Sequence, residues 1–128
     1  MSDSELLMEI IKQILEGIRR IERRFQGIES PSDFLKDDEG LDRLDAIGMM
    51  LIAIGESLKV FERSGGKKLL DSHGDVDWKG AKGLRDFLSH QYFDLDTEIV
   101  FEVCTERMAG LKEAIRKIGE ELDHGAAS

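Results

Sequence analysis

The sequence predicts an all-α protein, built as an antiparallel bundle of four to five helices. Three long segments carry apolar residues that step alternately by four and by three positions, which is the period of one helix face. No stretch alternates apolar and polar residues as a half-buried strand would, and the chain contains a single proline. At 128 residues the chain can bury one core. We therefore expect a single domain over residues 1–124, followed by a disordered tail at 125–128.

The first helix is expected to begin after Ser2 and to end near Gly27. Its apolar stripe consists of Leu7, Ile11, Ile14, Ile18, Ile21 and Phe25. A second start signal lies at 30–33, where Ser30 can cap a helix and Pro31 occupies its first position, which needs no N–H donor. A short helix to about Lys36 is expected there.

A long helix should follow the polar joint at 36–40. Its stripe consists of Leu44, Ile47, Leu51, Ile54, Leu58 and Phe61. Gly65 and Gly66 should end it, because glycine tolerates the left-handed backbone that closes a helix. Residues 67–77 read as a connector with one helical turn at 68–70, and His73 within it is expected to be an exposed loop histidine.

Another helix is predicted over 78–92, capped by the carboxylate of Asp77. Gly80 and Gly83 would weaken it by up to ~1 kcal/mol each relative to alanine, unless a neighbouring helix or second subunit approaches closely. The last helix should begin at 96–98, with a stripe made of Val100, Cys104, Met108, Leu111, Ile115, Ile118 and Leu122. As part of this stripe, Cys104 is expected to be buried and unreactive.

The charge balance argues at first against a nucleic-acid partner. The net charge is −9, from 18 basic and 27 acidic residues, and phosphate repels an acidic surface. Basic residues nevertheless cluster at Lys67, Lys68, Lys79, Lys82 and Arg85, and again at Arg19, Arg20, Arg23 and Arg24. We expect the first cluster to form a local RNA-contacting surface, with Lys79 and Lys82 as candidates. The second cluster is equally consistent with a solvated helix face.

The sequence contains no candidate membrane segment. No run of 18 or more apolar residues occurs, and the N-terminus is acidic where a signal peptide would be basic and then apolar. We therefore expect a cytoplasmic protein without a membrane partner.

Four residues whose side chains can take part in catalysis lie near the end of the predicted helix over 78–92. At 100° per residue, Asp86 and His90 would share one helix face, and Arg85 and Tyr92 another. In an arbitrary helix, the same residues could be structural, with His90 buried against Asp86, Arg85 in a surface ion pair and Tyr92 at the edge of the core.

The motif Arg85-x-x-x-x-His90-x-Tyr92, with Asp86 directly after the arginine, resembles the signature of HEPN-domain ribonucleases. The tyrosine narrows the resemblance to the HepT-like toxins of prokaryotic toxin–antitoxin pairs. Residues 34–61 also resemble the helix that precedes the motif helix in that family, and the resemblance is strong over roughly 30–96. It implies a HEPN-like bundle and a metal-independent RNA endonuclease without a cofactor.

RNA cleavage without a metal requires a base for the 2′-hydroxyl proton, an acid for the leaving oxygen and a cation beside the phosphate. His90 can serve as base or acid, because imidazole titrates near neutral pH. Arg85 offers paired donors that match phosphate oxygens, and Asp86 can orient the imidazole ring. Glu56, in an apolar stretch of the long helix, is a candidate supporting residue, although an ordinary exposed glutamate explains it equally well.

Helical geometry raises a difficulty for this site, because Arg85 and His90 would point about 140° apart on an ideal helix. Either Arg85 wraps around the helix, the helix end is distorted, or a second copy completes the site. The resemblance implies that the motif helices of two protomers meet across a dimer cleft. We therefore predict a homodimer with a composite site.

The resemblance also implies that Tyr92 accepts a nucleotidyl group from a cognate minimal nucleotidyltransferase antitoxin. An adenylate there would place charge and bulk where the RNA phosphate must bind. The alternative is a tyrosine hydrogen-bonded at a helix terminus. For the whole protein the alternative is a non-catalytic HEPN-type module that binds a nucleotidyltransferase or a nucleotide, which the acidic net charge favours.

Overall fold

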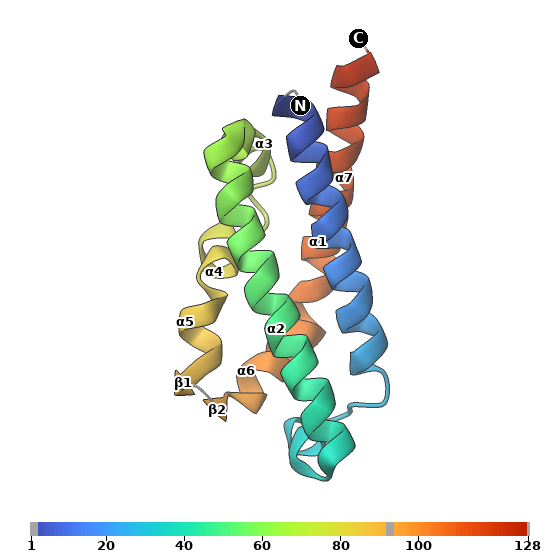
Figure 1. Ribbon diagram of the computed structural model, residues 1–128, viewed down its shortest axis with the longest axis vertical. Helices are drawn as coiled ribbons and strands as arrows, with labels where there is room; N and C mark the ends of the chain where they lie inside the picture. The colour runs from blue at the N-terminus through green and yellow to red at the C-terminus, as the bar shows by residue number, and fades with distance from the viewer. Residues whose placement is uncertain (1–2, 92–93, 128) are drawn as a thin grey trace.

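The computed structural model describes residues 3–91 and 94–127, and for 89–91 and 126–127 it describes the backbone alone. It confirms the all-α fold class. Four helical stretches alternate in direction along the bundle (Figure 1). They are α1 (Asp3–Phe25), α2 (Asp38–Phe61), the pair α4 (Trp78–Lys82) and α5 (Leu84–Leu88), and the run of α6 (Thr97–Glu102), η3 (Val103–Arg107) and α7 (Met108–Ala127).

Short elements join these stretches. A 3₁₀ turn, η1 (Pro31–Leu35), precedes α2, and a wide turn, η2 (Glu62–Gly66), leads from α2 into α3 (Lys67–Asp71). Strands β1 (Ser89–Gln91) and β2 (Asp94–Leu95) pair antiparallel, with Ser89 opposite Leu95. The sequence showed no strand pattern, and this small hairpin was not predicted.

The predicted helix boundaries are mostly confirmed because local capping decides them. Gly27 and Gly65 have φ of 85° and 103°, so both ends that were assigned to glycine do use the left-handed backbone. Asp37 caps α2 by accepting a hydrogen bond from the N–H of Gly40 at 2.8 Å. Asp96 likewise caps α6, accepting from Glu98 at 3.0 Å and from the next N–H.

The hydrophobic core lies between α1, α2 and α7, where the predicted stripes meet. Side chains at most 2% exposed include Ile14, Ile18, Ile47, Leu51, Ile54, Leu58, Phe61, Ile115 and Ile118. α2 is the central helix, since it contacts α1 on one side and α4 and α5 on another. None of the described helices is both long and apolar enough to span a bilayer.

α7 is described as a helix to Ala127, and the disorder expected at 125–128 stays a prediction. One local expectation differs from the structure. His73 is not an exposed loop side chain, because it is only 14% exposed and its Nε2 lies 2.9 Å from Oε1 of Glu121 on α7. No local or periodic pattern indicates this pairing, which joins residues 48 positions apart.

Candidate active site

The segment that carries the Arg-His-Tyr motif begins as a helix but does not remain one. Asp77 accepts a hydrogen bond from the N–H of Gly80 at 2.9 Å, which confirms the predicted cap. α4 then ends at Lys82, and the N–H of Gly83 bonds back to the carbonyls of Lys79 and Gly80 at 3.1 and 3.2 Å. α5 ends at Leu88 and β1 follows. The prediction of one helix over 78–92 is therefore wrong.

Glycines of α2, rather than those of α4, allow the close approach. A Cβ at Gly55 would lie 2.7 Å from the carbonyl oxygen of Ala81, and one at Gly48 would lie 2.6 Å from Cδ1 of Leu95 in β2. The two glycines are seven positions apart, or about two helical turns, and so share a face. At Gly83, by contrast, a Cβ would meet only ordinary contacts at 3.4 Å and beyond. α2 thus provides the flat surface against which the motif segment packs.

Arg85 and Asp86 are both exposed on α5, whose buried side chains are Leu84 and Leu88. The Arg85 side chain is 66% exposed, and its Nε lies 3.8 Å from Oε1 of Glu56 on α2. The same Glu56 oxygen lies 3.3 Å from Nζ of Lys59. Glu56 therefore bridges two cations and faces the motif.

His90 occupies the middle of β1, so it does not share a helix face with Asp86 as predicted. Its side chain, and all of Tyr92, lie outside the described residues. Because the helix ends before His90, the 140° separation from Arg85 on one straight helix also does not apply. One of the three resolutions considered, distortion of the helix end, is present in the backbone, since α5 ends at Leu88.

Lys79 and Lys82 lie on α4, at the start of the motif segment. They line a groove of about 680 Å³ between α2–η2 and α4–α5, which we call the basic groove. Lys82 is not free in it, because its Nζ lies 2.5 Å from Oε2 of Glu62. Two further cations from the opposite wall, Lys59 and Arg63, line the same groove. Sequence reasoning missed both, since they precede the motif by more than 20 positions.

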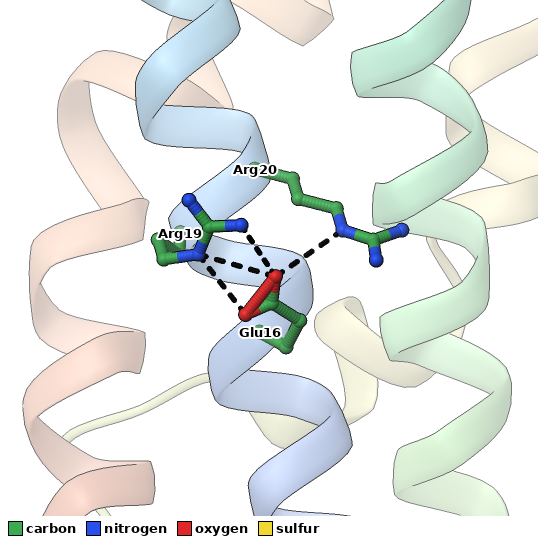
Figure 2. A network of polar contacts seen from close by, with 3 residues as sticks. All are labelled: Glu16, Arg19 and Arg20. Atoms are coloured by element: carbon green, nitrogen blue, oxygen red, sulfur yellow. Dashed lines mark hydrogen bonds and ion pairs between the residues drawn. The ribbon is translucent and has the colours of Figure 1, made fainter.

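The second basic cluster is partly neutralised within α1. In Figure 2 the guanidinium groups of Arg19 and Arg20 both approach the carboxylate of Glu16. Arg19 contacts it at 2.6 Å and Arg20 at 3.4 Å. Hydrogen bonding from Arg19, with smaller contributions from its charge and from Arg20, lowers the Glu16 pKa to about 2. This favours the solvated-face interpretation for Arg19 and Arg20. Their helix, α1, is separated from α4–α5 by α2 (Figure 1).

Cys104 is half-buried on η3, and burial raises its thiol pKa to about 12. A thiol with so little thiolate at neutral pH is a poor nucleophile, as expected for this position. Among the described residues, no three His, Cys, Asp or Glu side chains gather as a metal site would require.

Residues 14–118 match the family described as ribonuclease HepT-like, which covers most of the described helices and the whole motif. The chain belongs to the HepT-like ribonuclease family.

Two relatives of this HepT-like chain carry ribonuclease names. One, from Caldanaerobacter subterraneus subsp. tengcongensis, is named "Putative RNase"; it is 32% identical over 108 residues, covering 84% of this chain and 89% of the relative. The other, from Methanocaldococcus jannaschii, is named "Gamma-glutamylcyclotransferase and putative RNase" and is 32% identical over 115 residues. That match covers 88% of this chain but only 47% of the relative, so the chain spans about half of that protein. No solved structure is significantly similar to the chain.

Proposed function

We propose that this protein is a metal-independent RNA endonuclease of a toxin–antitoxin pair, acting as a homodimer through Arg85 and His90. The observation that carries the proposal is the family match over 14–118, which includes the motif that begins at the exposed Arg85 of α5. The exposed guanidinium of Arg85 and the neighbouring basic groove support a site open to a polyanion. RNA is the substrate class that the family description and the relatives' names favour.

The reaction needs no group beyond the chain's own side chains. The imidazole of His90 takes the proton of a ribose 2′-hydroxyl as that oxygen attacks the adjacent phosphorus, and the bond from phosphorus to the 5′-oxygen breaks. The departing 5′-oxygen receives a proton from the protonated imidazole of the second protomer's His90, and the products are a 2′,3′-cyclic phosphate and a 5′-hydroxyl end. Arg85 stabilises the charge that develops on the phosphate oxygens. Asp86, which adjoins Arg85, is assigned the role of orienting the imidazole.

The homodimer belongs to this proposal because the family resemblance implies it. Arg85 and Asp86 are exposed on α5, so both side chains are accessible to a partner protomer and to RNA. In the proposed dimer, His90 of one protomer acts as the base and His90 of the other acts as the acid.

Cleavage of RNA in the presence of a chelator tests the catalytic assignment. His90→Ala should lower the rate by about 10²- to 10⁴-fold, since general acid–base catalysis typically contributes that much. Lys117→Gln, which alters an exposed cation on α7, serves as the control and should cleave like the wild type. Equal cleavage by wild type and His90→Ala would identify a contaminating nuclease. It would leave the alternative, a helical module that binds a nucleotidyltransferase or a nucleotide.

Tyr92 is proposed as the position at which a cognate nucleotidyltransferase antitoxin silences the enzyme. Incubation with such an antitoxin and ATP should add an adenylate, detected as a mass increase, and should stop RNA cleavage. Tyr92→Phe should remain unmodified and active under the same conditions. A wild-type chain that gains no mass would defeat this part of the proposal.

A further inference from the structure

The basic groove has cationic side chains on both of its walls. Lys59 and Arg63 come from α2 and η2, and Lys79 and Lys82 from α4. The walls are more than 15 positions apart in sequence, so only the packing of α4 against Gly55 brings them together. A groove with cations on two sides can hold the backbone of a nucleic acid strand along its length.

Not all of these cations are available to a ligand. Lys82 is paired with Glu62 at 2.5 Å, and Lys59 with Glu56 at 3.3 Å. Arg63 and Lys79 have no ion-pair partner within the part of the chain that the structure describes.

The acids of the groove are largely occupied. Glu62 is paired with Lys82, and the carboxylate of Asp77 caps α4 by accepting from the N–H of Gly80, although Asp77 and Asp86 are both exposed. Arg63 and Lys79 are therefore the side chains best able to bind phosphate.

An aromatic side chain stands at the edge of the same groove. Phe87 is 57% exposed, although Leu84 and Leu88 of the same short helix are buried. Such an exposed ring does not contribute to the hydrophobic core. Any RNA base can stack on it, whatever the RNA sequence. Binding sites for single-stranded nucleic acid typically combine cationic side chains with an exposed aromatic ring.

The groove continues toward the proposed cleavage site. Glu56 contacts Lys59 in the groove and Arg85 on α5 through one oxygen, at 3.3 and 3.8 Å. Asp86, the neighbour of Arg85 on α5, lines the groove together with Phe87. A strand whose scissile phosphate lies at Arg85 can thus extend past Phe87 into the groove.

We infer that the basic groove binds the single-stranded RNA segment flanking the scissile phosphate, with Arg63 and Lys79 on phosphates and one base stacked on Phe87. This inference rests on the proposed function and adds a requirement for unpaired RNA. A blunt duplex cannot offer an unstacked base to Phe87, so single strands are preferred.

Binding of a fluorescent single-stranded oligoribonucleotide to the His90→Ala protein, followed by anisotropy, tests this inference without cleavage. Phe87→Ala in that background should weaken binding by about 5- to 150-fold, the range of one base stack, while Phe87→Trp should retain it. Arg63→Gln and Lys79→Gln should each reduce the slope of log affinity against log salt by about 0.7, the value for one phosphate contact with a single strand. Lys117→Gln is the control and should change neither quantity. Duplex RNA of the same length should bind more weakly than the single strand.

Three results would overturn the inference: Phe87→Ala binding like the wild type, no loss from Arg63→Gln and Lys79→Gln relative to Lys117→Gln, or duplex binding as tight as single-strand binding. Light scattering provides a further check, because a Phe87→Ala protein that changes oligomeric state would assign the ring to a contact between protomers instead. These failures differ from failure of the proposed function. If His90→Ala still cleaves, the nuclease assignment falls, whereas groove-dependent binding would stand.

Discussion

Replacing Gly55 by alanine tests whether close contact with α2 sets the position of the motif segment. The new Cβ would lie 2.7 Å from the carbonyl oxygen of Ala81 and 3.3 Å from that of Lys82. Ordinary contact begins at 3.4 Å, so the Ala81 carbonyl must retreat by about 0.7 Å, the difference between 3.4 and 2.7 Å. Both obstructing atoms belong to the backbone, so no side-chain rotation can relieve the overlap.

Overpacking of this kind costs about 1–3 kcal/mol. Alanine also gains about 1 kcal/mol over glycine in a helix, which acts in the opposite direction. Gly110→Ala on α7 separates the two effects, because a Cβ there meets nothing within 4 Å and carries the propensity gain alone. The free energies of unfolding of the two variants should therefore differ by about 1–3 kcal/mol, with Gly55→Ala the less stable.

Thermal unfolding followed by circular dichroism measures this difference. For a domain of this size about 1 kcal/mol corresponds to roughly 4 °C, so the melting temperatures should differ by about 4–12 °C. RNA cleavage should fall with Gly55→Ala and not with Gly110→Ala, because only the former displaces α4. Equal stabilisation of both variants would refute the reasoning, since it would mean that α4 does not approach α2 as closely as described.

Three other predictions concern α5, the thiol and α1. Leu88→Ala should lower the free energy of unfolding in urea by about 2–5 kcal/mol, because Leu88 is fully buried; Phe87→Ala, at an exposed position, should change it by less than about 0.5 kcal/mol. Cys104 should react with a disulfide reagent at pH 8 far more slowly in the native protein than in urea, because burial raises its pKa to about 12. The carboxyl of Glu16 should titrate near pH 2 by NMR, and Arg19→Gln should move its pKa toward 4.5. Because the folded pKa is the lower one, any stabilisation from Glu16 is complete above pH 4.5 and is lost as the pH falls through about 2.

Each of these predictions has a contrary outcome. Equal losses of unfolding free energy from Leu88→Ala and Phe87→Ala would mean that α5 does not pack on the core through Leu88. Native labelling of Cys104 at the unfolded rate would mean that the thiol is accessible. A wild-type Glu16 carboxyl that titrates near pH 4.5 would mean that the ion pair between Arg19 and Glu16 does not form in solution.

The bundle could be predicted from sequence because its determinants are local or periodic. The stripes of α1, α2 and α7 identify the buried faces. Asp77 and the segment 96–98 mark helix starts, because the short side chains of Asp77 and Asp96 can accept the free N–H groups. Gly27 and Gly65 mark helix ends by their tolerance of positive φ. These signals require only neighbours in the sequence.

The geometry of the site could not be predicted in the same way. The helix over 78–92 breaks because β1 pairs with β2 and because α4 and α5 pack separately on α2, and neither contact leaves a periodic signal. The glycines assigned to close approach were Gly80 and Gly83, whereas Gly55 has that role from the facing helix. The sequence therefore identifies the residues of the motif, but their relative positions depend on tertiary packing.

The motif segment is also the part of the molecule least able to stay folded alone. α4 and α5 have five residues each, far below the length at which a helix is stable in water, and Trp78, Leu84 and Leu88 are their buried side chains. This segment can therefore open as a unit while α1, α2 and α7 remain folded, and its amide protons should exchange with solvent sooner than theirs. A ligand that binds only the folded segment would slow that exchange. The fraction of time for which the site is assembled therefore depends on the ligand bound there.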